Sequence, residues 1–337
     1  MIVGNIDISG DINVNAASTA TLTLNAFGNI SGTGNISNVR SIIFNVSGSN
    51  ATGTLSGNIT GASTSVNKTG SATSTLILSG TGNTYGGGTT VDAGTLEIDG
   101  SLGTAGVYAG TINVGNATTQ ANLTFGSASN INLTGTINVL NASSAITQNG
   151  NGCLTITSSL AGYKGFLNIT SGTLALKNNG DFNNASGLDL SGGTLDATAI
   201  TLTSLNLQTL SGNSISTPGS LVLGTKNLAL SAVTDDLYDG SISGTGLVNI
   251  TGTGGYTLAG ASTFSGTLKF DVAGQTLTLD DPLALQNAKL NLANGSLDIL
   301  QSTQLRSLLG GATTNVVLNA NTLTLANASD SFAGNIS

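Results

Sequence analysis

Short runs of alternating hydrophobic and polar residues follow one another along almost the whole chain. TATLTLNAFGNISGTGNI at 19–36 and ASNINLTGTINVLNASSAI at 128–146 are examples, in which Gly, Asn and Ser separate runs of three to five residues. Alternation with a period of two predicts strands with one buried face, and the small polar residues between them predict turns. The chain is therefore expected to be all-β.

One stretch of this pattern recurs 78 residues later (163 − 85) with the same internal spacing. The first copy consists of Leu76, Leu78, Tyr85, Gly87, Val91, Gly94, Leu96 and Ile98. The second copy consists of Leu154, Ile156, Tyr163, Gly165, Ile169, Gly172, Leu174 and Leu176. Two looser copies contain Phe264 with Gly266 and Phe332 with Gly334. Repetition at this scale indicates a repeat architecture.

Very short strands, small bends and repetition favour a parallel β-helix over a hairpin sandwich, whose strands are usually longer. In such a coil Leu76, Val91 and Leu96 point inward, and Tyr85 covers a corner beside glycines that allow a close approach of the backbone. Coils of about 20–25 residues would give roughly 13–17 coils. We expect residues 1–337 to form one continuous β-solenoid.

One segment departs from the strand pattern. Leu305, Leu308 and Leu309 are spaced as on one face of a helix, Ser302 can cap its start, and Gly310-Gly311 can end it. The spacing predicts a short helix at 302–309, lying against the solenoid.

The chain carries few charges. Only 7% of its residues are charged, against roughly 25% in average domains, and its net charge is −8 with a pI near 4.1. The eight Lys and Arg residues do not cluster, which argues against nucleic acid or an anionic membrane as a partner. The sequence contains no run of about 18 apolar residues, so we expect no transmembrane helix.

The two ends of the sequence and its one cysteine also carry information. The N-terminus lacks the pattern of a signal peptide, and the chain stops within a repeat, so we expect a fragment of a longer secreted protein. Cys153 is alone, which excludes an intramolecular disulfide.

The residues of the first repeat carry a family resemblance. LILSGTGNTYGGGTTVDAGTLEI at 76–98 resembles the autotransporter-associated β-strand repeat of Gram-negative passenger domains. STQLRSLLGGATTNVVLNANTLTLAN at 302–327 resembles filamentous-haemagglutinin-like exoproteins, in which a short helix precedes a strand. The resemblance implies a right-handed, single-stranded parallel β-helix that is exported across two membranes and displayed at the cell surface or released.

Candidate chemistry is sparse. The acidic residues are fifteen Asp and the single Glu97, and the densest group is Asp235, Asp236 and Asp239, which we interpret as a solvated turn. A Ca²⁺ site or a pair of catalytic carboxylates would also fit that group. The absence of His excludes a Ser-His-Asp triad and His-ligated metals, and no cofactor is expected.

These observations favour a structural and interaction protein: the stalk or passenger segment of a secreted surface adhesin, without catalytic activity. Its partner would be a host-cell or glycan surface, contacted through a broad polar face of Thr, Ser and Asn. A second hypothesis is a self-assembling fibre or surface layer, in which copies of the chain cover each other's open ends. A third is a β-helix enzyme that processes polysaccharides, with Asp235 and Asp239 at its site, and a fourth is an ice-binding protein with a flat Thr face.

Overall fold

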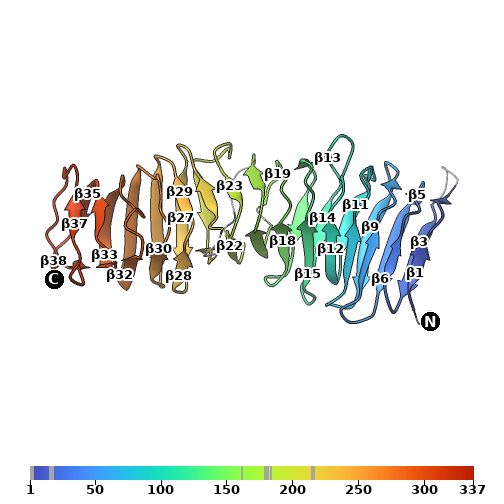
Figure 1. Ribbon diagram of the computed structural model, residues 1–337, viewed down its shortest axis with the longest axis horizontal. Coiled ribbons are helices and arrows are strands. Elements are labelled where there is room, and N and C mark those ends of the chain that lie inside the picture. Colours follow the sequence, from blue (N-terminus) through green and yellow to red (C-terminus); the bar gives the residue numbers. More distant parts are fainter. Residues whose placement is uncertain (1–3, 15–18, 161, 178–181, 183, 214–216) are drawn as a thin grey trace. The chain divides into compact units, whose positions relative to one another are not determined.

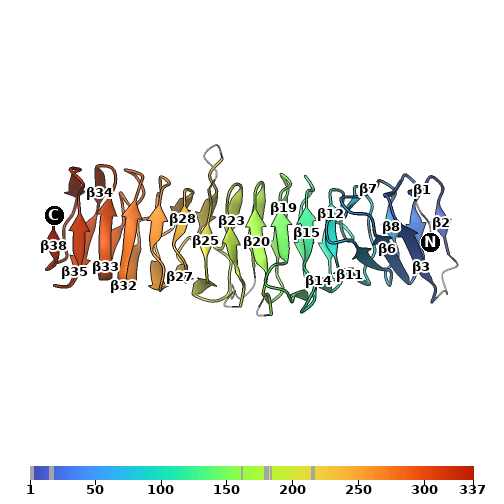
Figure 2. The ribbon, with the colours of Figure 1, turned by 90° about the horizontal axis from the view of Figure 1, so that it is seen from below.

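The computed structural model describes residues 4–14, 19–160, 162–177, 182, 184–213 and 217–337. The chain divides into two compact units, Met1–Leu174 and Ala175–Ser337. In each unit short parallel strands stack coil upon coil as a β-solenoid, with about 15 turns in all and no helix among the described residues (Figures 1 and 2). The predicted all-β, parallel β-helix class is thereby confirmed. That the coils run on without a break from one unit to the next stays a prediction.

Three faces make up each coil of the first unit. The first face contains β1 (Ile6–Ile8), β4 (Ile30–Gly32), β7 (Thr52–Leu55), β10 (Thr75–Leu78), β12 (Gly94–Ile98), β15 (Ala121–Phe125), β18 (Ala145–Gln148) and β20 (Phe166–Ile169). The second face contains β2 (Ile12–Asn13), β5 (Ile36–Ser37) and β8 (Ile59–Thr60), and in a separate sheet β13 (Val107–Tyr108), β16 (Ile131–Leu133) and β19 (Cys153–Ile156). The third face contains β3 (Thr21–Ala26), β6 (Ser41–Val46), β9 (Ser65–Gly70), β11 (Gly88–Val91), β14 (Ile112–Val114) and β17 (Ile137–Val139).

The second unit is built in the same way, and β21 (Thr173–Leu176) lies across the boundary. One face contains β24 (Ser204–Leu207), β27 (Asn227–Ala232), β30 (Leu247–Gly252), the first halves of β32 (Thr267–Leu279) and β33 (Lys289–Ile299), and β35 (Ser307–Gly310). Another contains β22 (Gly187–Asp189), β25 (Leu210–Ser211), β28 (Asp236–Tyr238), β31 (Tyr256–Leu258), the second halves of β32 and β33, β36 (Asn315–Val317) and β38 (Asn335–Ile336). The remaining strands are β23 (Thr194–Asp196), β26 (Ser220–Val222), β29 (Ser241–Ser243), β34 (Thr303–Leu305) and β37 (Leu323–Leu325).

Alternate residues of each strand form columns along the interior. On the first face Leu76 of β10 pairs with Leu96 of β12, which pairs with Leu123 of β15, and all three are buried. Because strands on successive coils are in register, apolar side chains at equivalent positions pack on one another. This stacking is the core of each unit, and it explains why the apolar residues recur with a period of two.

The predicted helix at 302–309 is wrong. Residues Thr303–Leu305 form β34 and Ser307–Gly310 form β35, on two faces that meet at Arg306. Leu305 and Leu308 each point into the core from their own strand, whereas Leu309 is 39% exposed. A change of face between two short strands produces the same leucine spacing as one face of a helix.

The two close copies of the repeat lie on different faces. Leu76 and Leu78 belong to the first face, whereas Leu154 and Ile156 belong to the second. The repeated pattern therefore corresponds to a corner with its flanking strands, and it occurs at corners between different faces. No helix among the described residues is long and apolar enough to cross a membrane.

Candidate functional site

The aspartates singled out from the sequence lie around β28 but do not form one group. Asp235 accepts a hydrogen bond from the main-chain N–H of Gly255 at 2.7 Å, and Asp236 accepts one from the Thr234 hydroxyl at 3.3 Å. Both line a hollow of about 240 Å³. Burial is the main cause that raises the pKa of Asp236, and the neighbouring Asp235 charge adds to it against the Thr234 bond.

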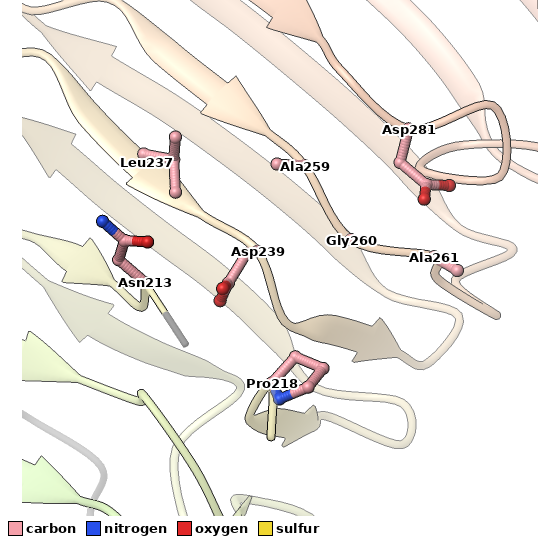
Figure 3. Close-up of a pocket in the computed structure, with 8 residues that line it drawn as sticks. All are labelled: Asn213, Pro218, Leu237, Asp239, Ala259, Gly260, Ala261 and Asp281. Atoms are coloured by element: carbon pink, nitrogen blue, oxygen red, sulfur yellow. The ribbon is translucent and has the colours of Figure 1, made fainter. Parts of the chain in front are cut away.

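Asp239 lines a different hollow, of about 400 Å³, together with Asp281 and Leu237 (Figure 3). Asp281 accepts a hydrogen bond from the N–H of Leu283 at 2.7 Å, as a turn residue does. The charge of Asp239 also contributes to the raised pKa of Asp189, although burial contributes more. Asp189 is absent from our sequence-based candidates because it lies on a distant stretch of chain.

Each hollow contains two carboxylates. Over the residues that the structure describes, no three Asp, Glu, His or Cys side chains come close enough to hold one ion. Asp235, Asp236 and Asp281 instead accept hydrogen bonds from main-chain N–H groups or a hydroxyl of neighbouring turns. Asp235 is exposed and fits a solvated turn, whereas Asp236 is half-buried and one of its carboxylate oxygens has no hydrogen-bond partner among the described residues. Cys153 carries a free, half-buried thiol.

Three aromatic residues of the repeat, Tyr85, Tyr163 and Phe264, are buried, and Phe332 is half-buried. Tyr85 is fully buried, and its ring meets that of Tyr108 edge to face at a centroid distance of 5.6 Å. The hydroxyl of Thr89 lies between the two phenols, 3.1 Å from Tyr85 Oη and 2.8 Å from Tyr108 Oη. Burial raises the pKa of Tyr85 to about 12, and it raises that of Tyr108 as well, so both phenols stay neutral at physiological pH.

A glycine two residues after the aromatic is required by contact. A Cβ at Gly266 would lie 2.6 Å from Cζ of Phe264, and a Cβ at Gly334 would lie 2.6 Å from Cζ of Phe332. The added Cβ atoms would lie closer still, at 2.0 and 2.2 Å, to a carbonyl oxygen of the preceding coil. Since real Cβ atoms do not approach so closely, the ring and this carbonyl together require glycine at both positions. At Gly87 and Gly165 the three atoms nearest to an added Cβ all belong to the preceding coil, so Tyr/Phe-x-Gly marks a corner at which the chain lies close against the coil before.

Two further corners have the Tyr/Phe-x-Gly sequence but are not among the copies of the repeat identified from the sequence. They are Tyr108-Ala109-Gly110 and Tyr238-Asp239-Gly240, where the added Cβ would lie 2.6 and 2.5 Å from the Cζ of the tyrosine. The signal was present in the sequence, but these copies lack the flanking leucines that defined the repeat.

Lys68 and Gln148 are long polar side chains that interrupt apolar columns of the first unit. Lys68 is fully buried, paired in register with Phe44 and Val91 of the coils on either side. Its ammonium donates to Ser74 Oγ at 2.8 Å and to the carbonyls of Thr69 and Ala93, at 2.9 and 3.2 Å. Because burial disfavours the charged form, the pKa of Lys68 falls to about 8.

Gln148 also donates hydrogen bonds to main-chain carbonyls from inside the coil, but it carries no charge. It is 2% exposed in the column of Phe125 and Ile169, and its amide donates to the carbonyls of Gly150 and Gly152, at 2.7 and 3.2 Å. Both side chains satisfy carbonyls that turn inward where the chain leaves a strand. Their partners identify Lys68 and Gln148 as structural groups.

The outer surface of the third face carries a continuous polar column. Asn67, Thr90, Asn113 and Asn138 occupy equivalent positions on β9, β11, β14 and β17, and we call these four residues the polar wall. The amide of Asn138 donates to Oδ1 of Asn113 at 2.8 Å, as stacked amides do in a ladder. Asn67 donates to Asp92 at 3.0 Å, while its own Oδ1 has no hydrogen-bond partner among the described residues.

Comparison with known proteins adds no identification. No protein-family model, curated protein or solved structure matches this chain. The likeness to passenger domains therefore stays a resemblance, carried by the repeat residues alone.

Proposed function

We propose that the chain is a structural and interaction segment, a stalk or passenger, of a secreted bacterial surface adhesin. It acts outside the cell or at its surface, without catalysis, and contacts a host-cell or glycan surface through side chains such as those of the polar wall. The observation that carries this proposal is the repetition of uncharged polar side chains at the same outward position of successive coils. Such a repeating surface supplies many weak, equivalent contacts, which add up when the partner is also repetitive.

Two further observations support the proposal. The repeat at 76–98 resembles that of exported passenger domains. The aspartates around β28, which are Asp235, Asp236 and Asp239, are divided between two hollows, and Asp235 and Asp236 accept hydrogen bonds from neighbouring turns. A paired acid and base for polysaccharide cleavage would instead require two carboxylates that face one bond of the substrate.

The proposal is tested with the purified chain immobilised on beads and offered to host cells and to a panel of surface glycans. Binding is expected, and the double variant Thr90→Lys with Asn113→Lys is expected to lose most of it. The matched control carries Thr124→Lys and Thr147→Lys, at equivalent outward positions of the first face. Binding that both double variants retain would contradict a role for the polar wall.

The same preparation separates a self-assembling subunit from the adhesin. A fibre or surface-layer subunit would show sedimentation coefficients that grow with protein concentration, and it would not need a host cell to do so. Release of reducing ends from acidic glycans would instead support the enzyme.

A further inference from the structure

One corner of the first unit lacks a hydrogen bond that its counterparts make. In the Tyr/Phe-x-Gly corners, the N–H of the middle residue donates to a carbonyl of the preceding coil. These bonds run from Gly86 to Gly61 (3.2 Å), Lys164 to Val139 (2.8 Å), Asp239 to Gly212 (3.2 Å), Ser265 to Gly244 (2.9 Å) and Ala333 to Gly310 (2.9 Å). At Tyr108-Ala109-Gly110 the N–H of Ala109 has no partner within the described part of the chain.

The cause is a hairpin in the chain just before this corner. The N–H of Val107 donates to the carbonyl of Thr104 at 3.0 Å, and Ala105 and Gly106 between them have φ of 52° and 78°. Positive φ at both central residues is the conformation of a tight hairpin turn. The hairpin adds residues to this coil and changes the path of the chain where it would meet the coil before.

The sheet of the second face is interrupted at the same place. Residues 84–86 pair with the preceding coil, through Thr84 N–H to the carbonyl of Ile59 at 2.9 Å, but no strand joins them to β13. β13 pairs with β16 on its other side, so it is the first strand of its sheet. An edge strand presents main-chain groups to which a further strand can bind.

A groove of about 460 Å³ lies along this interruption. We call it the hairpin groove, and residues 61–62, 84–86, 103–104 and 107–109 line it. None of these side chains is charged, and most are small, so that the main chain forms much of the lining. Val107 is 47% exposed at the hairpin.

We propose that the hairpin groove binds an extended, uncharged polypeptide segment of a partner protein, which accepts a hydrogen bond from the N–H of Ala109. A strand that adds to a sheet edge obtains its affinity from main-chain hydrogen bonds. In this groove the N–H of Ala109 is available to donate one, whereas the equivalent N–H at the other corners already donates to a carbonyl of the preceding coil. A charged segment would lose hydration without gaining a counter-charge. The rings of Tyr85 and Tyr108 are buried against each other, so neither offers a face on which a sugar ring could stack.

The structure also supplies a probe. Segment 241–247, SISGTGL, contains the carbonyl of Gly244 that accepts from Ser265 at a corner of the second unit. A synthetic peptide of this sequence with blocked termini is titrated into the isotope-labelled full chain, and the amide resonance of Ala109 is followed. A saturable shift and slower hydrogen exchange of that amide are expected. No saturation up to about 5 mM peptide would overturn the proposal.

Variants assign the contact. Ala109→Pro removes the N–H and should weaken binding by about fivefold to tenfold, the value of one main-chain hydrogen bond. Ala109→Gly keeps the N–H and should bind as the wild type does. If Ala109→Pro does not fold, Ala62→Tyr, at an exposed position of the groove, should abolish binding by filling it. Full binding by the folded Ala109→Pro variant, or by Ala62→Tyr, would overturn the proposal, as would saturation of the Ala109 shift by maltohexaose in place of the peptide.

Discussion

The buried lysine makes the stability of the first unit depend on pH in a direction that can be calculated. The ordinary lysine pKa of 10.5 falls to about 8 in the folded chain, because the ammonium of Lys68 is removed from water. Between these two values the unfolded chain binds a proton that the folded chain does not. The free energy of unfolding must therefore rise as the pH rises from about 8 towards 10.5.

The slope has an upper limit. A difference of one bound proton contributes about 1.4 kcal/mol per pH unit, so this group can add about 2–3 kcal/mol between about pH 8 and pH 10. Above about pH 10 the buried tyrosines act in the opposite sense. The pKa of Tyr85 is raised to about 12, so unfolding releases phenolic protons there and stability falls with a further rise in pH.

The matched variant is Lys68→Gln, because Gln148 shows that an amide can satisfy inward carbonyls in a column of the same kind. Urea unfolding of both proteins is followed from about pH 7 to pH 10 by the β-sheet circular-dichroism signal. The difference in unfolding free energy, wild type minus variant, should rise with pH, and the variant should show no rise between about pH 8 and pH 10. A flat difference over that range would refute the structural role assigned to Lys68.

Three further predictions concern side chains and glycines of the interior, and each is measured by urea unfolding. Gly266→Ala should destabilise by about 2–3 kcal/mol, because its Cβ would lie 2.0 Å from the carbonyl oxygen of Gly246 and 2.6 Å from the Phe264 ring. Gly311→Ala, with no atom within 4 Å of the added Cβ, should change stability by less than about 1 kcal/mol, and equal effects of the two variants would contradict these contacts. Tyr256→Phe should cost about 1–2 kcal/mol because the phenol donates to the buried carbonyl of Leu210 at 2.7 Å, and a neutral result would mean that this bond is not made. Leu292→Ala should cost about 2–5 kcal/mol as a fully buried position of β33, and a loss below about 1 kcal/mol would place it outside the core.

The hydrophobic pattern was sufficient to predict the fold class. Leu76, Leu78 and Val91 are buried in the structure, as are Leu96 and Ile98. In a parallel solenoid each strand meets its neighbours in register, so the requirement for an inward apolar side chain is repeated at every coil. The period of two is consequently preserved even in strands of three residues.

The same pattern was misleading where the chain changes face. Leu305, Leu308 and Leu309 have helical spacing, but a corner at Arg306 redirects the chain between the first leucine and the two that follow. Corners are set by the position of the neighbouring coil, which lies about 20–25 residues away in sequence, as in the Asn25–Asn45 and Asn13–Asn38 pairs. The local spacing of leucines does not contain that information.

The interior polar groups and the hairpin groove were also beyond the sequence. Nothing in SVNKTG at 65–70 distinguishes an inward Lys68 from a surface lysine until the register with Phe44 and Val91 is known. Similarly, the unpaired N–H of Ala109 is defined, within the described residues, by comparison with equivalent corners. The Tyr/Phe-x-Gly signal was within reach, since it needs only an aromatic residue and a glycine two positions later.

The proposed role as a surface adhesin segment can be measured in the source cell. The region that encodes residues 1–337 is deleted in frame, and adhesion of the cells to host cells is counted with and without a restored copy. Adhesion is predicted to fall on deletion and to return with the restored copy. Unchanged adhesion by cells that lack the segment, when wild-type cells display it at their surface, would contradict the proposed role.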